Sequence, residues 1–395
     1  MLKKKIIIQF NEANFDLIEK YCKKYELPYL SKIINYPSKL ITSSEDDYSN
    51  LEPWIQWYSF YTGLSFKEHK TFHLGDCLKS NHINFIENIA KKNSVGVFGS
   101  MNLRPNQNYK IFIPDPWTET ESDKSFNSYY VNLAIKVLVN SNARLKLSYK
   151  SIIGLILLIG IPKKINDLNI VFKILFSYMK KSRTHLASYF DYLYFSYAIK
   201  RIKKNNIKFS LIFLNGLAHI QHHYFLSSEN VKSSNPIWYD KGQDQILKSL
   251  KIYNDLFKNL NDLNETEVWV VTGLTQEPQE KPIFYWRFKN HMSLINEFLN
   301  INLKVFTRMT RDFEIEYYKE EDKLLIKNFL ENSYLLNENK YKSKAFTNID
   351  FSKRNRAFAT FAYNGETEKI TLCWDNLKTS LKGKLDFVAI KNGKH

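Results

Sequence analysis

The sequence predicts an α/β fold: a mainly parallel sheet flanked by helices, with a helical insertion and a small C-terminal α+β part. Several short apolar runs rich in Val, Ile and Phe show little alternation, which is typical of strands buried on both faces. Segments of helical length, with apolar residues at positions i, i+3 and i+4, lie between these runs. Strand and helix therefore alternate along the chain, and this order favours a parallel sheet.

The expected strands end abruptly at polar residues. The four runs are KIIIQF before Asn11, SVGVFG before Ser100, FSLIFL before Asn215, and EVWVVT before Gly273. The segments NFDLIEKYCKKY and DQILKSLKIYNDLFKNL are expected to be helices. Ligands of such sheets bind at the carboxyl ends of the strands. We therefore expect one edge of the sheet to gather Asn11, Glu12, Asn215, His219, Thr272 and Gln276.

The predicted α/β core comprises residues 1–124 and 206–300. Residues 125–205 lack strand signals and are expected to form a basic helical insertion or cap. Residues 301–395 are expected to form an α+β extension packed on the core. In this last part, residues 303–317 alternate as a strand does, and Asn364-Gly365 predicts a turn between two strands.

Composition indicates a soluble globular protein, with 44 % hydrophobic and 25 % charged residues among 395. The three cysteines, Cys22, Cys77 and Cys373, lie far apart and form no CxxC pair, which favours a reducing compartment. No apolar run is long enough to span a bilayer, and the N-terminal run is too short for a signal peptide. We expect a cytoplasmic protein, with a position at the inner membrane surface as the alternative.

The net charge of +17 is concentrated in the expected insertion. Between Val131 and Asn205 there are fourteen Lys and Arg against two acids, Asp167 and Asp191. A basic, apolar segment with a helical pattern indicates an anionic partner, such as a membrane surface or a lipid-linked phosphate. The alternative is a solvated helical face. No nucleic-acid motif accompanies the charge, so a nucleic-acid partner is not expected.

Four landmarks follow one another in a recognisable order. LEPWIQWYSFYTGLSFKEHK carries Thr62-Gly63 and then His69, SLIFLNGLAHI carries Asn215-x-x-x-His219, EVWVVTGLTQ carries residues 272–275, and His291 follows. This order resembles the alkaline phosphatase superfamily, especially its type I phosphodiesterase and nucleotide pyrophosphatase branch. In that family strands end in a metal-binding Asp, in D-x-x-x-H and in S-D-H-G, and a Thr or Ser nucleophile precedes Thr-Gly. The resemblance covers roughly residues 1–120 and 205–300 and implies that fold.

The chain departs from the family pattern at the metal ligands and at the nucleophile. Asn11 and Asn215 stand where the family has Asp, Gly273-Leu274 replaces Asp-His, and the nucleophile position falls near Trp54. A neutral amide is a poor ligand for a divalent cation, so we do not expect a two-zinc site or assign any cofactor. The alternative is one divalent metal, zinc or manganese, held by His219, His223 and His291.

Histidines and acids near the expected strand ends are candidates for acid–base work. His219 and His223 are four residues apart and share a helix face, but no acid lies between them, as a zinc-binding helix would need. The predicted catalytic residues are His219, His291, Glu52 and Glu12. The predicted substrate-binding residues are Asn11, Asn215, His222, His223, Gln276, Arg104 and Trp57. The ordinary alternatives are hydrogen-bonded histidines, an exposed loop acid, a surface arginine and a core tryptophan.

The sequence therefore favours a divergent alkaline phosphatase-like hydrolase or transferase without the usual two-metal site. Its substrate would be an anionic, phosphate- or sulfate-bearing molecule, such as a sugar or a lipid-linked glycan of surface-polysaccharide metabolism. The alternative is a catalytically inactive protein that binds an anionic glycan or a partner, because the metal ligands and nucleophile are lost. A third hypothesis, compatible with both, is docking of residues 131–205 on an anionic membrane surface.

Overall fold

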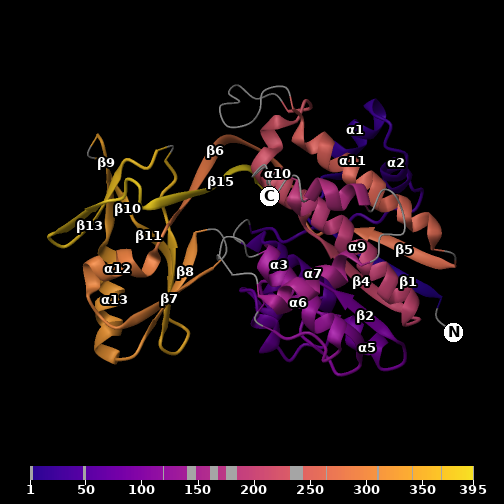
Figure 1. The fold of residues 1–395 in the computed structure, drawn as a ribbon, viewed down its shortest axis with the longest axis horizontal. Helices are drawn as coiled ribbons and strands as arrows, with labels where there is room; N and C mark the ends of the chain where they lie inside the picture. Colours follow the sequence, from indigo (N-terminus) through magenta and orange to yellow (C-terminus); the bar gives the residue numbers. More distant parts are fainter. Residues whose placement is uncertain are drawn as a thin grey trace. The chain divides into compact units, whose positions relative to one another are not determined.

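The computed structural model describes residues 3–47, 50–118, 120–139, 148–160, 168–174, 185–231, 243–263, 265–308, 311–339, 341–365 and 367–394 (Figure 1). The chain divides into two compact units. The first contains most of the chain up to Glu280, and the second contains Lys281–Lys391. Residues 281–300, which the sequence analysis assigns to the core, therefore belong to the second unit.

The first unit is built on a five-stranded sheet in which all strands are parallel, and this confirms the predicted α/β class. The strand order is β3 (Tyr109–Ile113), β2 (Val95–Phe98), β4 (Phe209–Leu214), β1 (Lys4–Phe10) and β5 (Thr266–Val271). The four expected strands are present, and β3 is an addition. In the central register Ile8 lies beside Ile212 and Val270, so the carboxyl ends of β1, β4 and β5 coincide.

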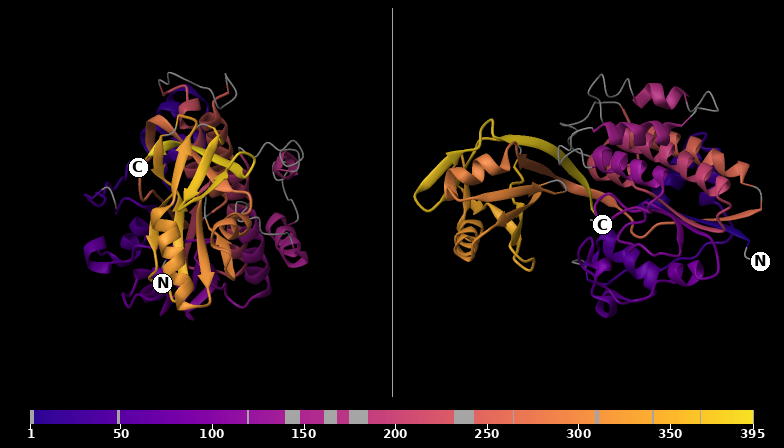
Figure 2. Two further views of the ribbon diagram at one scale, coloured as in Figure 1. Left: turned by 90° about the vertical axis from the view of Figure 1, so that its left-hand side faces the viewer. Right: turned by 60° about the horizontal axis from the view of Figure 1, so that its bottom comes forward.

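Helices cover both faces of this sheet (Figure 2). One face packs against α1 (Phe15–Lys24), α2 (Pro28–Ile34), α6 (Phe126–Val139), α7 (Tyr149–Ile159), α9 (Leu186–Lys204), α10 (Gly216–Tyr224) and α11 (Gln245–Lys258). The other face packs against α3 (Pro53–Thr62) and α5 (Phe85–Ala90). Shorter elements are α4 (Phe66–His69), η2 (Asp76–Leu78), η4 (Phe225–Ser227) and η5 (Asn259–Asp262). In β1, Ile6 and Ile8 enter the first core and Ile7 the second, as the two-residue period of a strand requires.

The expected helical insertion contains helices that are integral to the core. α9 packs on β4 and against α10 and α11, and its residues Tyr192 and Phe195 are fully buried. α6 and α7 pack against each other so closely at Gly154 that a Cβ there would lie 1.9 Å from the carbonyl oxygen of Tyr130. Residues 140–147, 161–167 and 175–184 of the expected insertion lie outside the described residues.

The second unit is a small α+β fold with antiparallel sheets, as the sequence predicts for the C-terminal part. One sheet has the order β11 (Phe346–Asp350), β12 (Arg356–Phe361), β8 (Asp312–Tyr317) and β7 (Leu303–Thr307). The other has the order β10 (Lys342–Lys344), β9 (Tyr334–Asn337), β13 (Ile370–Trp374) and β14 (Leu377–Ser380). Its helices are α12 (His291–Leu299) and α13 (Glu320–Asn332), and β6 (Glu277–Phe288) pairs with β15 (Leu385–Lys394).

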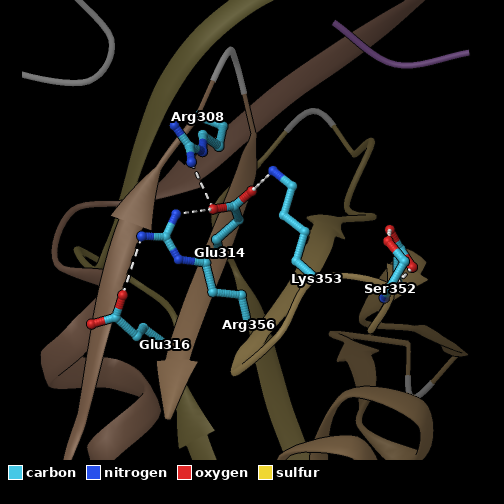
Figure 3. Close-up of polar contacts among 7 residues, drawn as sticks. Arg308, Glu314, Glu316, Ser352, Lys353 and Arg356 are labelled. Carbon is cyan, nitrogen blue, oxygen red and sulfur yellow. Dashed lines mark hydrogen bonds and ion pairs between the residues drawn. The ribbon is translucent and has the colours of Figure 1, made fainter. Parts of the chain in front are cut away.

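A buried carboxylate organises one face of the β7–β8–β12 sheet. Glu314 is only 2 % exposed, and it accepts hydrogen bonds from Arg308 at 2.6 Å, Lys353 at 2.8 Å and Arg356 at 3.2 Å (Figure 3). Arg356 also reaches Glu316 at 3.1 Å. Burial raises the pKa of Glu314, but the hydrogen bonds and charges of Lys353 and Arg308 outweigh it and lower that pKa below its usual value. These groups already satisfy one another, as a structural ion-pair network does.

Candidate functional site

Polar side chains from three strand ends meet at the carboxyl edge of the parallel sheet. Asn11 and Glu12 follow β1, Asn215 follows β4, and Gln276 lies between β5 and β6. The Asn11 Nδ2 donates to Asn215 Oδ1 at 2.8 Å and to Glu12 Oε1 at 3.0 Å. The Gln276 Nε2 donates to Glu12 Oε2. With His222, these residues form what we call the strand-end cluster.

Glu12 is the centre of the strand-end cluster. Its side chain is almost completely buried, and its Oε2 lies 3.0 Å from the Nε2 of His222. Its backbone has a φ of 53°, in the left-handed region that is uncommon for a glutamate. The Gln221 Nε2 donates to the Glu12 carbonyl oxygen at 2.6 Å and holds this turn. A buried carboxylate needs hydrogen-bond donors, and here two amides and an imidazole surround it.

α10 begins directly after Asn215 and carries three histidines, His219 in its first half and His222 and His223 in its last turn. The side chain of His222 is 26 % exposed, so a molecule in solvent can reach its ring. His219 and His223 lie edge to face with their ring centroids 4.5 Å apart. Desolvation by the surrounding protein, and then the charge of His222, lower the pKa of His219 to about 4. His219 is nevertheless one of the exposed residues of α10.

Asp191, a buried acid on α9, holds the first residue of α10 by a hydrogen bond. The Asp191 Oδ2 accepts the Gly216 N–H at 2.7 Å and the Tyr253 hydroxyl at 2.5 Å. Burial raises the pKa of Asp191 to about 7, although these hydrogen bonds act in the opposite direction. A Cβ on Gly216 would lie 2.7 Å from the Ala187 carbonyl and from the Tyr253 hydroxyl. Only glycine fits there, and the position of Asn215 is set by this packing.

Trp57 lies beneath the cluster as a core residue. Its side chain is buried, its ring packs edge to face with Phe60 and Phe213, and its Nε1 donates to Asn11 Oδ1 at 2.7 Å. A Cβ on Gly273 would lie 3.3 Å from the Trp57 ring. The backbone at Gly273 therefore packs closely against the Trp57 indole. Trp57 presents no open ring face on which a ligand could stack.

Other predicted site residues have different surroundings. The Arg104 guanidinium binds both carboxylate oxygens of Glu87, at 2.7 and 2.9 Å, and donates to the Ser80 carbonyl. Glu52 is the N-cap residue of α3. His291 opens α12 in the second unit, where it packs against the rings of Phe288 and Phe313. Arg104 is thus a structural ion-pair partner, and His291 is part of the second unit's own core.

His69, a landmark of the resemblance, is held as a neutral imidazole. Its Nδ1 accepts the Thr71 N–H at 3.0 Å, so the proton lies on Nε2, which is 3.0 Å from the Ser59 hydroxyl. Burial lowers the pKa of His69 to about 4. The residue therefore ties the segment after α4 to α3.

The donor set does not fit the two-metal site that the family resemblance implies. Asn11 Oδ1 accepts from Trp57 and Asn215 Oδ1 accepts from Asn11, so both amide oxygens face N–H donors where the family has carboxylates facing a cation. Gly273 and Leu274 contribute no ligand side chain. Within the described ranges, no group of three or more His, Cys, Asp and Glu is arranged to hold a metal ion.

Two residues of the site were not found from the sequence. The Asn14 Nδ2 donates to the Gln276 carbonyl at 2.8 Å, and its backbone N–H donates to Gln221 Oε1 at 3.3 Å. Asn14 also caps α1 by accepting the Leu17 N–H at 2.8 Å. An asparagine before an amphipathic run is a recognisable N-cap, so Asn14 had a detectable signal. Gln221 had none, because only the fold brings it beside Glu12.

Comparison with known proteins identifies no family for this chain. No family model matches it, and no curated protein matches it. The chemistry of the strand-end cluster is therefore the feature that indicates a function.

Proposed function

We propose that the strand-end cluster is the active site of a divergent alkaline phosphatase-like hydrolase or transferase that lacks the two-metal site. Its substrate is an anionic, phosphate- or sulfate-bearing molecule. The observation that carries the proposal is the pair of Glu12 Oε2 and His222 Nε2 at 3.0 Å. The pair lies at the carboxyl edge of a parallel sheet, where α/β proteins bind ligands.

The geometry of the pair suits general acid–base catalysis. Asn11 and Gln276 hold the Glu12 carboxylate, and the carboxylate in turn orients the His222 ring. His222 then takes a proton from the attacking group or returns one to the leaving group. A positioned acid–base group contributes about 10² to 10⁴ in rate.

Amide donors take the place that cations have in the family. Because Asn215 Oδ1 accepts from Asn11, its Nδ2 is directed elsewhere, and Asn215 is partly exposed. This Nδ2 supplies a donor to an anionic group of the substrate. The Oε1 of Gln276 is buried and has no hydrogen-bond partner within the part of the chain that the structure describes. A buried acceptor of this kind suits a substrate hydroxyl or a bound water.

The alternative is a catalytically inactive protein that binds an anionic glycan or partner through the same cluster. The observation that favours it is the chain of hydrogen bonds from Trp57 to Asn11 and from Asn11 to Asn215, in which the residues at two of the family's metal-ligand positions bind each other. Such a network can keep a binding surface rigid, and it needs no catalytic group to do so.

A substrate screen distinguishes the two functions. The full chain is assayed against p-nitrophenyl phosphate, bis(p-nitrophenyl) phosphate and p-nitrophenyl sulfate, with Glu12→Gln and His222→Gln as test variants. Glu19→Gln, which changes an acid of α1 paired with Lys23, is the matched control. We expect turnover by the wild type and the control, and a loss of about 10²-fold or more in both test variants. Equal turnover in all four proteins contradicts the proposal. Binding of an inorganic phosphate or sulfate probe without turnover, abolished by Asn215→Ala, supports the inactive alternative.

A further inference from the structure

α7 presents an apolar face to solvent. Tyr149, Ile152 and Ile156 are 71, 48 and 64 % exposed, and their spacing places them on one side of the helix. The opposite side, with Gly154 and Leu158, is buried in the first unit. α7 is therefore anchored by one side, and it offers three large apolar side chains on the other.

The neighbouring helix α6 extends this face. The Lys150 Nζ lies 5.9 Å from the centre of the Tyr129 ring and 6.0 Å from that of the Tyr149 ring, so the two exposed tyrosines and the lysine are neighbours. Tyr129 is itself exposed. We call Tyr129, Tyr149, Lys150, Ile152 and Ile156 the α7 face. It combines aromatic, aliphatic and cationic side chains, as helices at a lipid–water interface do.

The sequence that contains α7 is strongly basic. Residues 131–205 carry fourteen Lys and Arg against two acids, and the described one of these acids, Asp191, is buried under α10. Lys150 lies at the start of α7. The Lys200 Nζ lies 3.6 Å from the place that a Cβ on Gly160 would take, so it is at the other end of α7. Cations therefore flank both ends of the apolar face.

From this arrangement we infer that the α7 face docks on the surface of an anionic lipid bilayer. α7 has eleven residues, about half the length needed to cross a bilayer, and its inner side is occupied by protein contacts. Nowhere among the residues that the structure describes is a helix long and apolar enough to cross a membrane. The helix therefore lies in the plane of the surface, with its aliphatic residues between the headgroups and its cations on anionic phosphates. A specific protein partner is the less favoured occupant, because the side chains that the structure places at the two ends of α7, Lys150 and Lys200, are both cations and suit anionic headgroups.

Vesicle flotation of the full chain tests the inference. Vesicles of phosphatidylcholine with about 30 % phosphatidylglycerol are compared with phosphatidylcholine alone, at about 0.05 M and 0.5 M salt. The test variant is Ile152→Glu with Ile156→Glu. The matched control adds the same charge at two exposed leucines of the second unit, Leu324→Glu with Leu377→Glu. We expect tight binding to the anionic vesicles that high salt weakens, a loss of about tenfold or more in the test variant, and no comparable loss in the control.

The inference fails if the wild type does not float, if neutral and anionic vesicles bind equally, or if both double variants bind alike. Self-association of the wild type that the Ile152 and Ile156 changes abolish, without binding to vesicles, would make the face a protein interface and overturn the inference. Two further variants guard against misfolding. Ile152→Ser with Ile156→Ser removes only apolar contact, and Lys150→Glu removes only a cation. Each is expected to weaken flotation of a protein whose circular dichroism and thermal unfolding are unchanged.

Discussion

The Nε2 of His222 lies 3.0 Å from the Oε2 of Glu12, across more than half of the first unit's sequence. Glu12 ends the turn after β1, and His222 lies on α10, the helix that follows β4. The side-chain amides of Asn11 and Gln276 hold the Glu12 carboxylate in place, so the His222 imidazole lies against a carboxylate of fixed position. This relationship gives the strand-end cluster its chemical character, and it can be measured without a known substrate.

We predict that Glu12 and His222 stabilise the fold jointly. Glu12→Gln and His222→Gln each remove the charge-assisted hydrogen bond, so the double variant should be less destabilised than the sum of the single variants. The expected coupling is about 1 kcal/mol in the free energy of unfolding, measured by urea titration of all four proteins. Strict additivity would show that the two side chains do not interact in solution.

We predict that Gly154→Ala destabilises the protein, although the same change in an exposed helix interior stabilises by about 1 kcal/mol. The new methyl group would lie 1.9 Å from the Tyr130 carbonyl oxygen and 2.9 Å from the Ala134 Cβ, so α6 and α7 must separate. A loss of about 2 kcal/mol or more is expected from such overpacking, read from the midpoint of urea unfolding. A gain in stability would mean that the two helices are not in contact as described.

We predict that Asp191 makes the fold less stable as the pH rises from about 4 to 7. Burial raises the folded-state pKa of Asp191 to about 7, above its unfolded value, so the folded protein keeps a proton that the unfolded chain has released. The stability linked to this proton is complete below the unfolded pKa and is lost as the pH approaches the folded pKa. Asp191→Asn, which does not titrate, should remove about 2 to 4 kcal/mol of this pH dependence.

The measurement for Asp191 is urea unfolding of the wild type and Asp191→Asn at about pH 5 and pH 8. At the lower pH the wild type should have the larger free energy of unfolding. This difference from the variant should shrink or reverse at the higher pH. Asp16→Asn, at an acid in the first turn of α1, is a control without a buried carboxylate. Parallel pH profiles of the wild type and Asp191→Asn would contradict the prediction.

Several parts of the fold could be predicted from the sequence because they depend on local pattern. The runs before Asn11, Ser100, Asn215 and Gly273 are largely apolar, and each is a strand of the parallel sheet, although the last of them, β5, is only partly buried. β3 was not predicted, because YKIFI is short and Lys110 interrupts it. α9 was assigned to an insertion or cap because residues 125–205 lack strand signals. Its burial depends on β4, α10 and α11, which lie outside the predicted insertion.

The candidate site also has a part that the sequence predicts and a part that it does not. The gathering of Asn11, Glu12, Asn215 and Gln276 followed from the parallel sheet alone, since the carboxyl ends of its strands share one edge. Arg104 was expected to be a phosphate ligand, but its partner is Glu87. A pairing of this kind cannot be seen in sequence, because an arginine in a loop has many acids within reach of its long side chain.

The sequence by itself determined the class of the fold, four of the five strands of the parallel sheet and the polar residues at their ends, because apolar runs and their order along the chain are local features of the sequence. The tertiary structure decided which partner each polar group meets. Trp57 reaches Asn11, His222 reaches Glu12 and Asp191 holds Gly216 only because elements distant in the chain pack at set distances. A hydrogen bond depends on tenths of an ångström and on direction, and packing alone supplies that accuracy.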